Sequence, residues 1–296
     1  SRSGIEERRV SHVPGSDLAA VAGLRALAAA GSEVEEVDLL ILATTSGDNI
    51  IPATGAYVQK KMGAVNAAVF DLNAGCCGFL YGLQVATSMI RSAGYKKVLV
   101  VGSERLTWLL NFSLRDTAVL FGDGAGAAVL EPSEEECGLL ACHLGCEGES
   151  LGALEVANSG TSGNRFEDDY GIFDVNFDGR EIFRKAVKGM AGEVRKVMTD
   201  LGLANKDISL IIPHQANQRI IDTMADRLGM PHERIVSTIS HYGNTSSASI
   251  PLALDDLYTS GQLQPGDLVG FVGFGAGLTW GAAIIRWTKP QPSKET

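Results

Sequence analysis

Two adjacent cysteines, Cys76 and Cys77, are the residues of this chain best suited to covalent chemistry. They follow a short apolar stretch at 67–72 and precede a segment, 78–94, whose only formal charge is Arg91. A helix that is apolar almost all round is normally buried, so we expect the pair at the first turn of a central helix. The helix end and its free N–H groups favour a thiolate, which could accept an acyl group by thioester exchange. With equal weight, both cysteines are small residues that fill the core.

Two polar residues after predicted strands in the second part of the chain could act with a thiolate. His214 follows the apolar run 208–212, and Asn244 lies in the turn after the run 235–239. The carboxyl ends of strands are where ligands bind in open α/β sheets. A neutral histidine and an asparagine together offer two hydrogen-bond donors, which suit a thioester enolate. Each also has an ordinary reading, as a loop histidine with satisfied hydrogen bonds and as a turn asparagine.

A glycine-rich turn at 275–277 offers backbone N–H groups suited to an oxyanion hole. Cysteine, histidine and asparagine are also the set used by papain-like proteases. The residues beside Cys76 are not those of that family, and its fold does not match the pattern of strands and helices described next.

Apolar runs alternate with helical patterns along most of the chain. We expect strands at 37–45, 67–72, 96–102, 120–130, 208–212, 235–239, 268–273 and 279–287. We expect helices at 16–30, 52–62, 78–94, 179–201, 218–228 and 248–259. The region 139–177 is the least regular and is interpreted as a connection. Alternating strands and helices indicate an α/β fold with mainly parallel sheets covered by helices.

The order of elements repeats after roughly 170 residues, which indicates an internal duplication. The stretch DLLILATT corresponds to DISLIIPH, and AVFDLNAGCCG corresponds to VSTISHYGNTS. We therefore predict two halves, 1–145 and 146–296, related by a pseudo-twofold axis. Such an axis brings the turns that carry Cys76, His214 and Asn244 to one shared pocket.

The composition excludes some classes of function. There are 25 Lys and Arg and 35 Asp and Glu, so the net charge of −10 argues against nucleic acid or an anionic membrane as a general partner. The five cysteines are an odd number without a metal-binding spacing, and we expect no metal. Reduced thiols, with neither a signal peptide nor a membrane-length apolar run, favour the cytoplasm.

Several motifs in order give the sequence a family resemblance. They are NAGCCGF at 73–79, FGDGAGAA at 121–128, PHQAN at 213–217, GNTS at 243–246 and FGAGLTWG at 274–281. Together they resemble the β-ketoacyl-acyl-carrier-protein synthase III family of the thiolase superfamily, over nearly the whole chain. The resemblance implies a thiolase-like fold, with five-stranded mixed sheets and helices in layers.

The resemblance also implies roles for individual residues. Cys76 is the nucleophile, because Cys77 falls where alanine is usual, and His214 and Asn244 stabilise the enolate when malonyl loses carbon dioxide. The backbone N–H groups of Cys76 and Ala276 form the oxyanion hole. The positions that line the coenzyme A and carrier-protein tunnel are Arg2, Arg115, Ala216, Asn217 and Arg219.

The implied reaction is the condensation of an acyl-coenzyme A starter with malonyl carrier protein, which initiates fatty-acid biosynthesis. Coenzyme A thioesters are substrates, so no separate cofactor is expected, and the family forms homodimers. The same pattern leaves room for a polyketide enzyme, for acyl transfer to another acceptor, and for a non-catalytic partner of carrier protein. Intact His214 and Asn244 favour condensation.

Some positions depart from the family pattern. Ile51 matches the residue that reaches across the dimer into the acyl pocket, but a large aromatic is common there, and Leu278 stands where phenylalanine is common. We therefore expect an acyl pocket shaped for a starter longer or bulkier than acetyl. The segment 111–115 lacks the usual acidic pattern before Arg115. The chain also begins about one strand and one helix later than family members do, from which we expect a truncated or disordered start.

Overall fold

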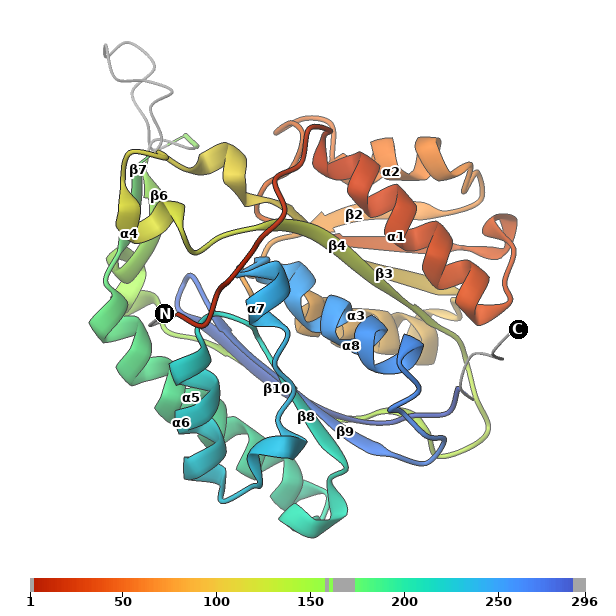
Figure 1. Ribbon diagram of the computed structural model, residues 1–296. Helices are drawn as coiled ribbons and strands as arrows, with labels where there is room; N and C mark the ends of the chain where they lie inside the picture. The colour runs from red at the N-terminus through yellow and green to blue at the C-terminus, as the bar shows by residue number, and fades with distance from the viewer. Residues whose placement is uncertain (1–2, 158–159, 162–173, 290–296) are drawn as a thin grey trace.

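Two four-stranded sheets form the framework of the computed structural model, which describes residues 3–157, 160–161 and 174–289 (Figure 1). The first sheet has the order β2-β1-β3-β4, in which β1 runs parallel to β2 and β3, and β4 is antiparallel to β3. Its strands are β1 (Leu39–Ala43), β2 (Ala68–Leu72), β3 (Val98–Arg105) and β4 (Asp123–Leu130).

The second sheet has the order β5-β10-β9-β8. Here β8 and β9 are parallel, and β10 is antiparallel to both β9 and β5. Its strands are β5 (Gly138–Cys146), β8 (Leu210–Pro213), β9 (Leu268–Gly275) and β10 (Thr279–Arg286). A separate antiparallel hairpin pairs β6 (Leu154–Ala157) with β7 (Asp174–Phe177).

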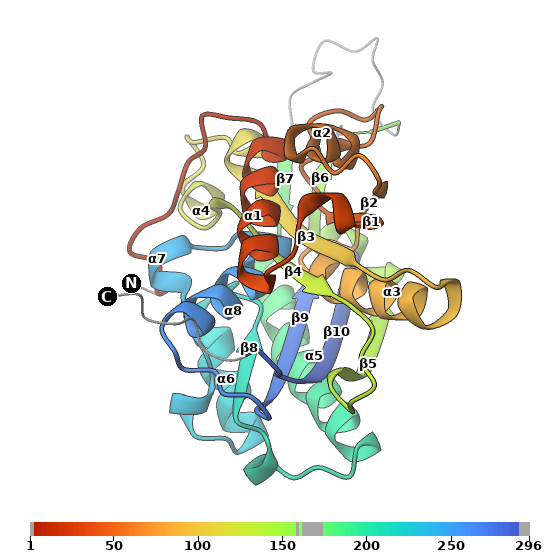
Figure 2. The same cartoon turned by 90° about the vertical axis from the view of Figure 1, so that its right-hand side faces the viewer.

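Helices and sheets alternate in layers, which the two views of Figures 1 and 2 show from the front and the side. One pair covers the outer face of the first sheet, a second pair lies between the sheets, and a third covers the outer face of the second sheet. The pairs are α1 (Gly15–Ala30) with α2 (Thr54–Met62), α3 (Gly78–Ala93) with α8 (Ser249–Thr259), and α5 (Gly179–Asp200) with α6 (Gln218–Leu228). Shorter helices are α4 (Arg115–Ala118) and α7 (Ile239–Tyr242).

Apolar sequence explains this layering. All five residues of β1 and all eight of β9 are buried, as expected of strands covered on both faces. Three apolar clusters fill the spaces between layers, and the middle one joins α3, α8 and both sheets. The central helix is buried over its first turns, but most of the side chains from Tyr81 onward are partly or fully exposed. The expectation of a helix buried throughout therefore holds only for the end that carries the cysteines.

The structure corrects several sequence-based expectations. Each main sheet has four strands in the described residues, where five were expected. The predicted strand 235–239 is reduced to one parallel bridge between Ile211 and Ile235, and the chain then forms α7. The irregular region 139–177 contains β5, which pairs with β10 and thus belongs to the second sheet. By sheet membership, the division between the halves falls before Gly138 rather than after residue 145.

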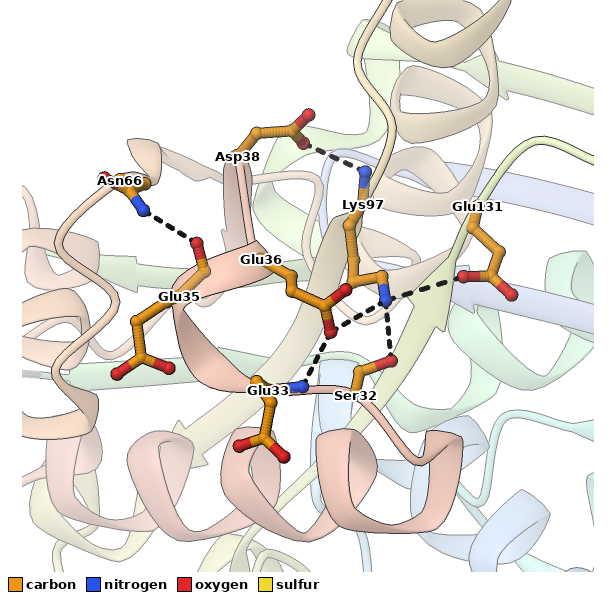
Figure 3. Close-up of polar contacts among 8 residues, drawn as sticks. All are labelled: Ser32, Glu33, Glu35, Glu36, Asp38, Asn66, Lys97 and Glu131. Atoms are coloured by element: carbon orange, nitrogen blue, oxygen red, sulfur yellow. Dashed lines mark hydrogen bonds and ion pairs between the residues drawn. The ribbon is translucent and has the colours of Figure 1, made fainter.

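The two ends of the first sheet differ in character. At the amino ends of its strands, Lys97 Nζ donates to Ser32 and forms ion pairs with Glu36 (3.2 Å) and Glu131 (3.7 Å) (Figure 3). The Asp38 carboxylate accepts hydrogen bonds from the backbone N–H groups of residues 96 and 97. These exposed contacts join the ends of α1, β1, β3 and β4. The opposite, carboxyl ends of the strands hold the residues singled out for chemistry.

A groove of about 1420 Å³ runs along β4 between α1 and α8. Neither Cys76, His214 nor Asn244 lines it, so the largest hollow described here is not the site examined for chemistry. None of the described helices is long and apolar enough to cross a membrane.

Candidate active site

One turn, residues 244–249, connects the three side chains that the sequence singled out. The side-chain Oδ1 of Asn244 accepts a hydrogen bond from the Ser246 N–H at 2.9 Å. The Ser246 side chain is hydrogen-bonded to Cys76. Ser249 Oγ lies 2.7 Å from Nδ1 of His214. The structure therefore brings together residues from three separate strand ends of both halves.

Cys76 lies just before α3, where the chain turns from β2 into the helix. Its turn faces the turn after β9 at the closest possible approach: a Cβ on Gly275 would lie 2.6 Å from the Cys76 backbone nitrogen. Glycine is required at position 275 for this reason. The backbone N–H groups of Cys76 and Ala276 both reach the Cys76 sulfur, which is the arrangement expected of an oxyanion hole beside a nucleophile.

Burial dominates the protonation of Cys76. It raises the pKa of the thiol to about 11, and the negative charge of Glu104 adds to this effect. Hydrogen bonds from Ser246 and from the two backbone N–H groups lower the pKa, but only in part. The expectation of a thiolate favoured by the helix end is therefore wrong for this structure, because desolvation of the charged sulfur outweighs the helix end.

His214 is buried too, with an exposed fraction of 2%, and burial lowers the pKa of its imidazole to about 4. It is consequently neutral at neutral pH, as the sequence predicted for an enolate donor. Ser249 Oγ accepts a hydrogen bond from the Gln215 N–H and is placed to donate its own proton to Nδ1. That pattern leaves the imidazole proton on Nε2. The sequence contains no signal for Ser249, which lies 35 residues from His214.

Asn244 is held by its backbone and by one side of its amide. Its backbone pairs with Leu120 and Gly122 of the first half, at 2.9 Å in each case. Because Oδ1 is engaged by Ser246, Nδ2 is the group left to donate to a substrate. Ser246 has a φ of 47°, which side chains other than glycine rarely adopt. This local backbone shape directs its N–H at Asn244.

Glu104, which the sequence analysis did not single out, is a fully buried carboxyl beneath this turn. It accepts hydrogen bonds from Ser46 Oγ (2.6 Å), Thr45 and Ser247 Oγ (2.9 Å). Burial raises the pKa of this carboxyl, and these donors oppose the shift. The contact with Ser247 crosses between the halves and fixes the turn that carries Asn244.

The predicted tunnel residues are partly described. Arg2 lies outside the described residues, although the carbonyl of its neighbour Ser3 accepts a hydrogen bond from the start of α6. Asn217 caps α6 by accepting from the Arg219 N–H, and Ala216 precedes it. Arg219 is exposed, with its guanidinium 5.7 Å from the centre of the Phe183 ring.

The remaining predicted positions lie apart from this helix end. Arg115 is exposed at the start of α4. Leu278 is fully buried in the turn between β9 and β10, whereas Ile51 is 85% exposed in a loop after β1. In the described part of the chain, no group of three or more His, Cys, Asp or Glu side chains is placed to hold a metal ion.

Comparison with known proteins gives consistent relatives. A family model for 3-oxoacyl-[acyl-carrier-protein] synthase III matches residues 70–148, and the model for the C-terminal part of that protein matches 198–287. The chain is 48% identical over 287 residues to beta-ketoacyl-[acyl-carrier-protein] synthase III 2 of Vibrio cholerae, covering 97% of this chain and 79% of that protein.

Two solved structures share the fold. The 3-oxoacyl-[acyl-carrier-protein] synthase III of Aquifex aeolicus superimposes with a TM-score of 0.90 at 39% identity, over 97% of this chain and 89% of that one. The priming β-ketosynthase of the R1128 polyketide pathway superimposes with a TM-score of 0.92 at 36% identity, over 98% and 87%.

Proposed function

This chain belongs to the 3-oxoacyl-[acyl-carrier-protein] synthase III family, and on that premise we propose how its own residues perform the condensation. The protein has the thiolase-like α/β fold and is an acyltransferase, a β-ketoacyl-acyl-carrier-protein synthase III that initiates fatty-acid synthesis. The assignment of Cys76, His214 and Asn244 as its catalytic residues is our proposal. The observation that carries it is the turn 244–249, which contacts all three.

In the first step, the Cys76 sulfur attacks the carbonyl carbon of an acyl-coenzyme A. The carbonyl oxygen becomes an oxyanion, which accepts hydrogen bonds from the N–H groups of Cys76 and Ala276. The carbon–sulfur bond to coenzyme A then breaks. The coenzyme A thiolate leaves with the proton that Cys76 has lost, and the acyl group remains as a thioester on Cys76.

In the second step, a malonyl group on carrier protein loses carbon dioxide. The electron pair of the broken bond forms a thioester enolate, whose oxygen accepts hydrogen bonds from His214 Nε2 and Asn244 Nδ2. The enolate carbon attacks the acyl-cysteine carbonyl, and the Cys76 thiolate leaves. The product is a β-ketoacyl thioester on carrier protein.

Mass spectrometry of the peptide that contains Cys76 tests this assignment. After incubation with acyl-coenzyme A, we expect one acyl adduct on Cys76 and none on Cys77. Malonyl carrier protein should then remove the adduct. An adduct on Cys77, or none with any of a panel of acyl donors, would contradict the proposal. The same panel identifies the starter, which we propose to be longer or bulkier than acetyl because Leu278 and Ile51 replace aromatic residues.

We further propose a cytoplasmic homodimer that needs no cofactor beyond its coenzyme A thioester substrate. Ile50 and Ile51 support the dimer, because they are 87% and 85% exposed and large apolar side chains on a loop favour burial against a partner. We propose Arg2, Arg115, Ala216, Asn217 and Arg219 as the lining of the coenzyme A and carrier-protein tunnel. Analytical ultracentrifugation of the protein and of Ile51→Asp tests the dimer.

The likeness to the R1128 priming ketosynthase supports a second candidate, the priming of a polyketide. The chemistry at Cys76 is the same in both cases, so the carrier protein discriminates between them. Equal activity with fatty-acid carrier protein supports fatty-acid synthesis. Activity restricted to a polyketide carrier protein supports the second candidate.

A further inference from the structure

The hydroxyl of Thr279 lies between the two turns that face each other at Cys76. Thr279 Oγ is 2.9 Å from the carbonyl oxygen of Ala74 and 3.0 Å from that of Ala276. Ala74 lies two residues before Cys76, and the N–H of Ala276 reaches the Cys76 sulfur. One buried hydroxyl at the start of β10 therefore joins turns that lie about 200 residues apart in the chain.

The spacing between these turns is too small for side chains to set it. A Cβ on Gly75 would lie 2.9 Å from the Ala276 oxygen and 3.0 Å from its nitrogen. A Cβ on Gly275 would lie 2.6 Å from the Cys76 nitrogen. Backbone therefore faces backbone, and hydrogen bonds hold the spacing. The two carbonyls face Thr279, while the N–H groups of Cys76 and Ala276 face the sulfur.

Cys77 supports Thr279 from the other side. Its side chain is fully buried and hydrogen-bonded to the Thr279 hydroxyl. The sulfur lies 3.1 Å from the position of a Cβ on Gly273, so β9 leaves room for it only because residue 273 is glycine. A hydroxyl that donates its single proton to a carbonyl is free to accept from a thiol. Cys77 thus has a structural partner, although it is not the nucleophile.

We propose that Thr279, supported by Cys77, is a positioning residue for the oxyanion hole of the acylation step. Its hydroxyl holds the Ala276 turn against the Cys76 turn and so directs the Ala276 N–H at the oxygen that becomes negative. This inference rests on the proposed function, because it requires that Cys76 be acylated.

Two reactions of the same sulfur test this role. Acylation by acyl-coenzyme A passes through an oxyanion, whereas alkylation by iodoacetamide displaces iodide and forms none. Thr279→Val keeps the shape of the side chain and removes the hydroxyl. We expect it to slow acylation of Cys76 about 10- to 100-fold while alkylation stays within about twofold, both measured on the Cys76 peptide. Thr279→Ser, which keeps the hydroxyl, should restore acylation to within about threefold.

Cys77 provides a second, smaller test that does not depend on Thr279→Val folding. Cys77→Ala should slow acylation about two- to fivefold and leave alkylation of Cys76 unchanged, because it removes only the thiol contact to Thr279. Cys77→Ser keeps a donor and should behave like the unmodified protein. The exposed Cys146 reports in every sample that iodoacetamide is active.

Three results would overturn the inference. They are normal acylation in Thr279→Val, an equal loss of acylation and alkylation in that variant, and failure of Thr279→Ser to restore acylation. If Thr279→Val does not fold, wild-type acylation rates in both Thr279→Ala and Cys77→Ala also overturn it. A wild-type protein whose Cys76 is alkylated but never acylated overturns the proposed function itself, a result distinct from those three.

Discussion

The two halves bring different chemical groups to the same site. The first half supplies Cys76 and the buried carboxyl of Glu104, and the second supplies His214, Asn244 and the N–H of Ala276. Burial raises the pKa of Cys76 to about 11 and lowers that of His214 to about 4. In both groups burial favours the uncharged form, so at neutral pH the site holds a thiol and a neutral imidazole rather than an ion pair.

This difference assigns the two halves separate steps. The first half forms and breaks covalent bonds at sulfur, with its own N–H and that of Ala276 to hold the oxyanion. The second half remains chemically unchanged and donates hydrogen bonds to the enolate. A papain-like site would instead need His214 charged beside a thiolate, which burial of both groups opposes.

Removal of the nucleophile should have the largest effect, because both steps need the sulfur. We expect Cys76→Ala to lower condensation by at least about 10⁴-fold and to abolish acylation, as measured by product formation and by mass spectrometry. Cys77→Ala is the matched control, since it removes the neighbouring sulfur. Comparable losses in both variants would contradict the assignment of Cys76.

Loss of the enolate donors should separate the halves. We expect His214→Ala and Asn244→Ala each to lower decarboxylation of malonyl carrier protein about 10²- to 10³-fold, while acylation of Cys76 continues. Release of labelled carbon dioxide and the acyl adduct are measured in parallel. If acylation falls as far as decarboxylation, the two halves do not divide the reaction.

The pH dependence of the two halves should differ as well. The thiolate is the reactive form, and a thiol with a pKa near 11 gains thiolate about tenfold per pH unit below that value. Alkylation of Cys76 should therefore rise about 100-fold between about pH 7 and about pH 9. Decarboxylation by pre-acylated protein should stay flat over that range, because His214 is already neutral well above its pKa of about 4. A fall in alkylation above pH 7 would contradict a raised thiol pKa.

The smallest effect is expected from the residue that holds His214. Ser249→Ala removes the contact to Nδ1 and allows the imidazole proton to move there, so decarboxylation should fall about tenfold without loss of acylation. The exposed Ser92→Ala serves as a control, since its side chain contacts only its own helix. A Ser249→Ala variant with normal decarboxylation would show that Nδ1 needs no partner.

Sequence patterns identified most of the fold, because each strand and helix here is long and its apolar period is clear. The predicted helix 16–30 is α1, and the predicted strand 279–287 is β10 within one residue. The strand predicted at 235–239 was wrong, because only Ile235 pairs with β8 before the chain turns into α7. The segment now seen as β5 was missed, because its mixed exposure gives it no clean alternation.

The sequence by itself determined the chemistry available to this protein: a cysteine before an apolar helix, and a histidine and an asparagine after strands of a repeated unit. Only the tertiary structure decided how those groups are tuned. Ser249, Glu104 and Thr279 act on partners 35, 143 and 205 residues away, and no local spacing encodes such contacts. Burial, which follows from the packing of both halves, set the pKa of Cys76 against the direction that its helix position alone would give.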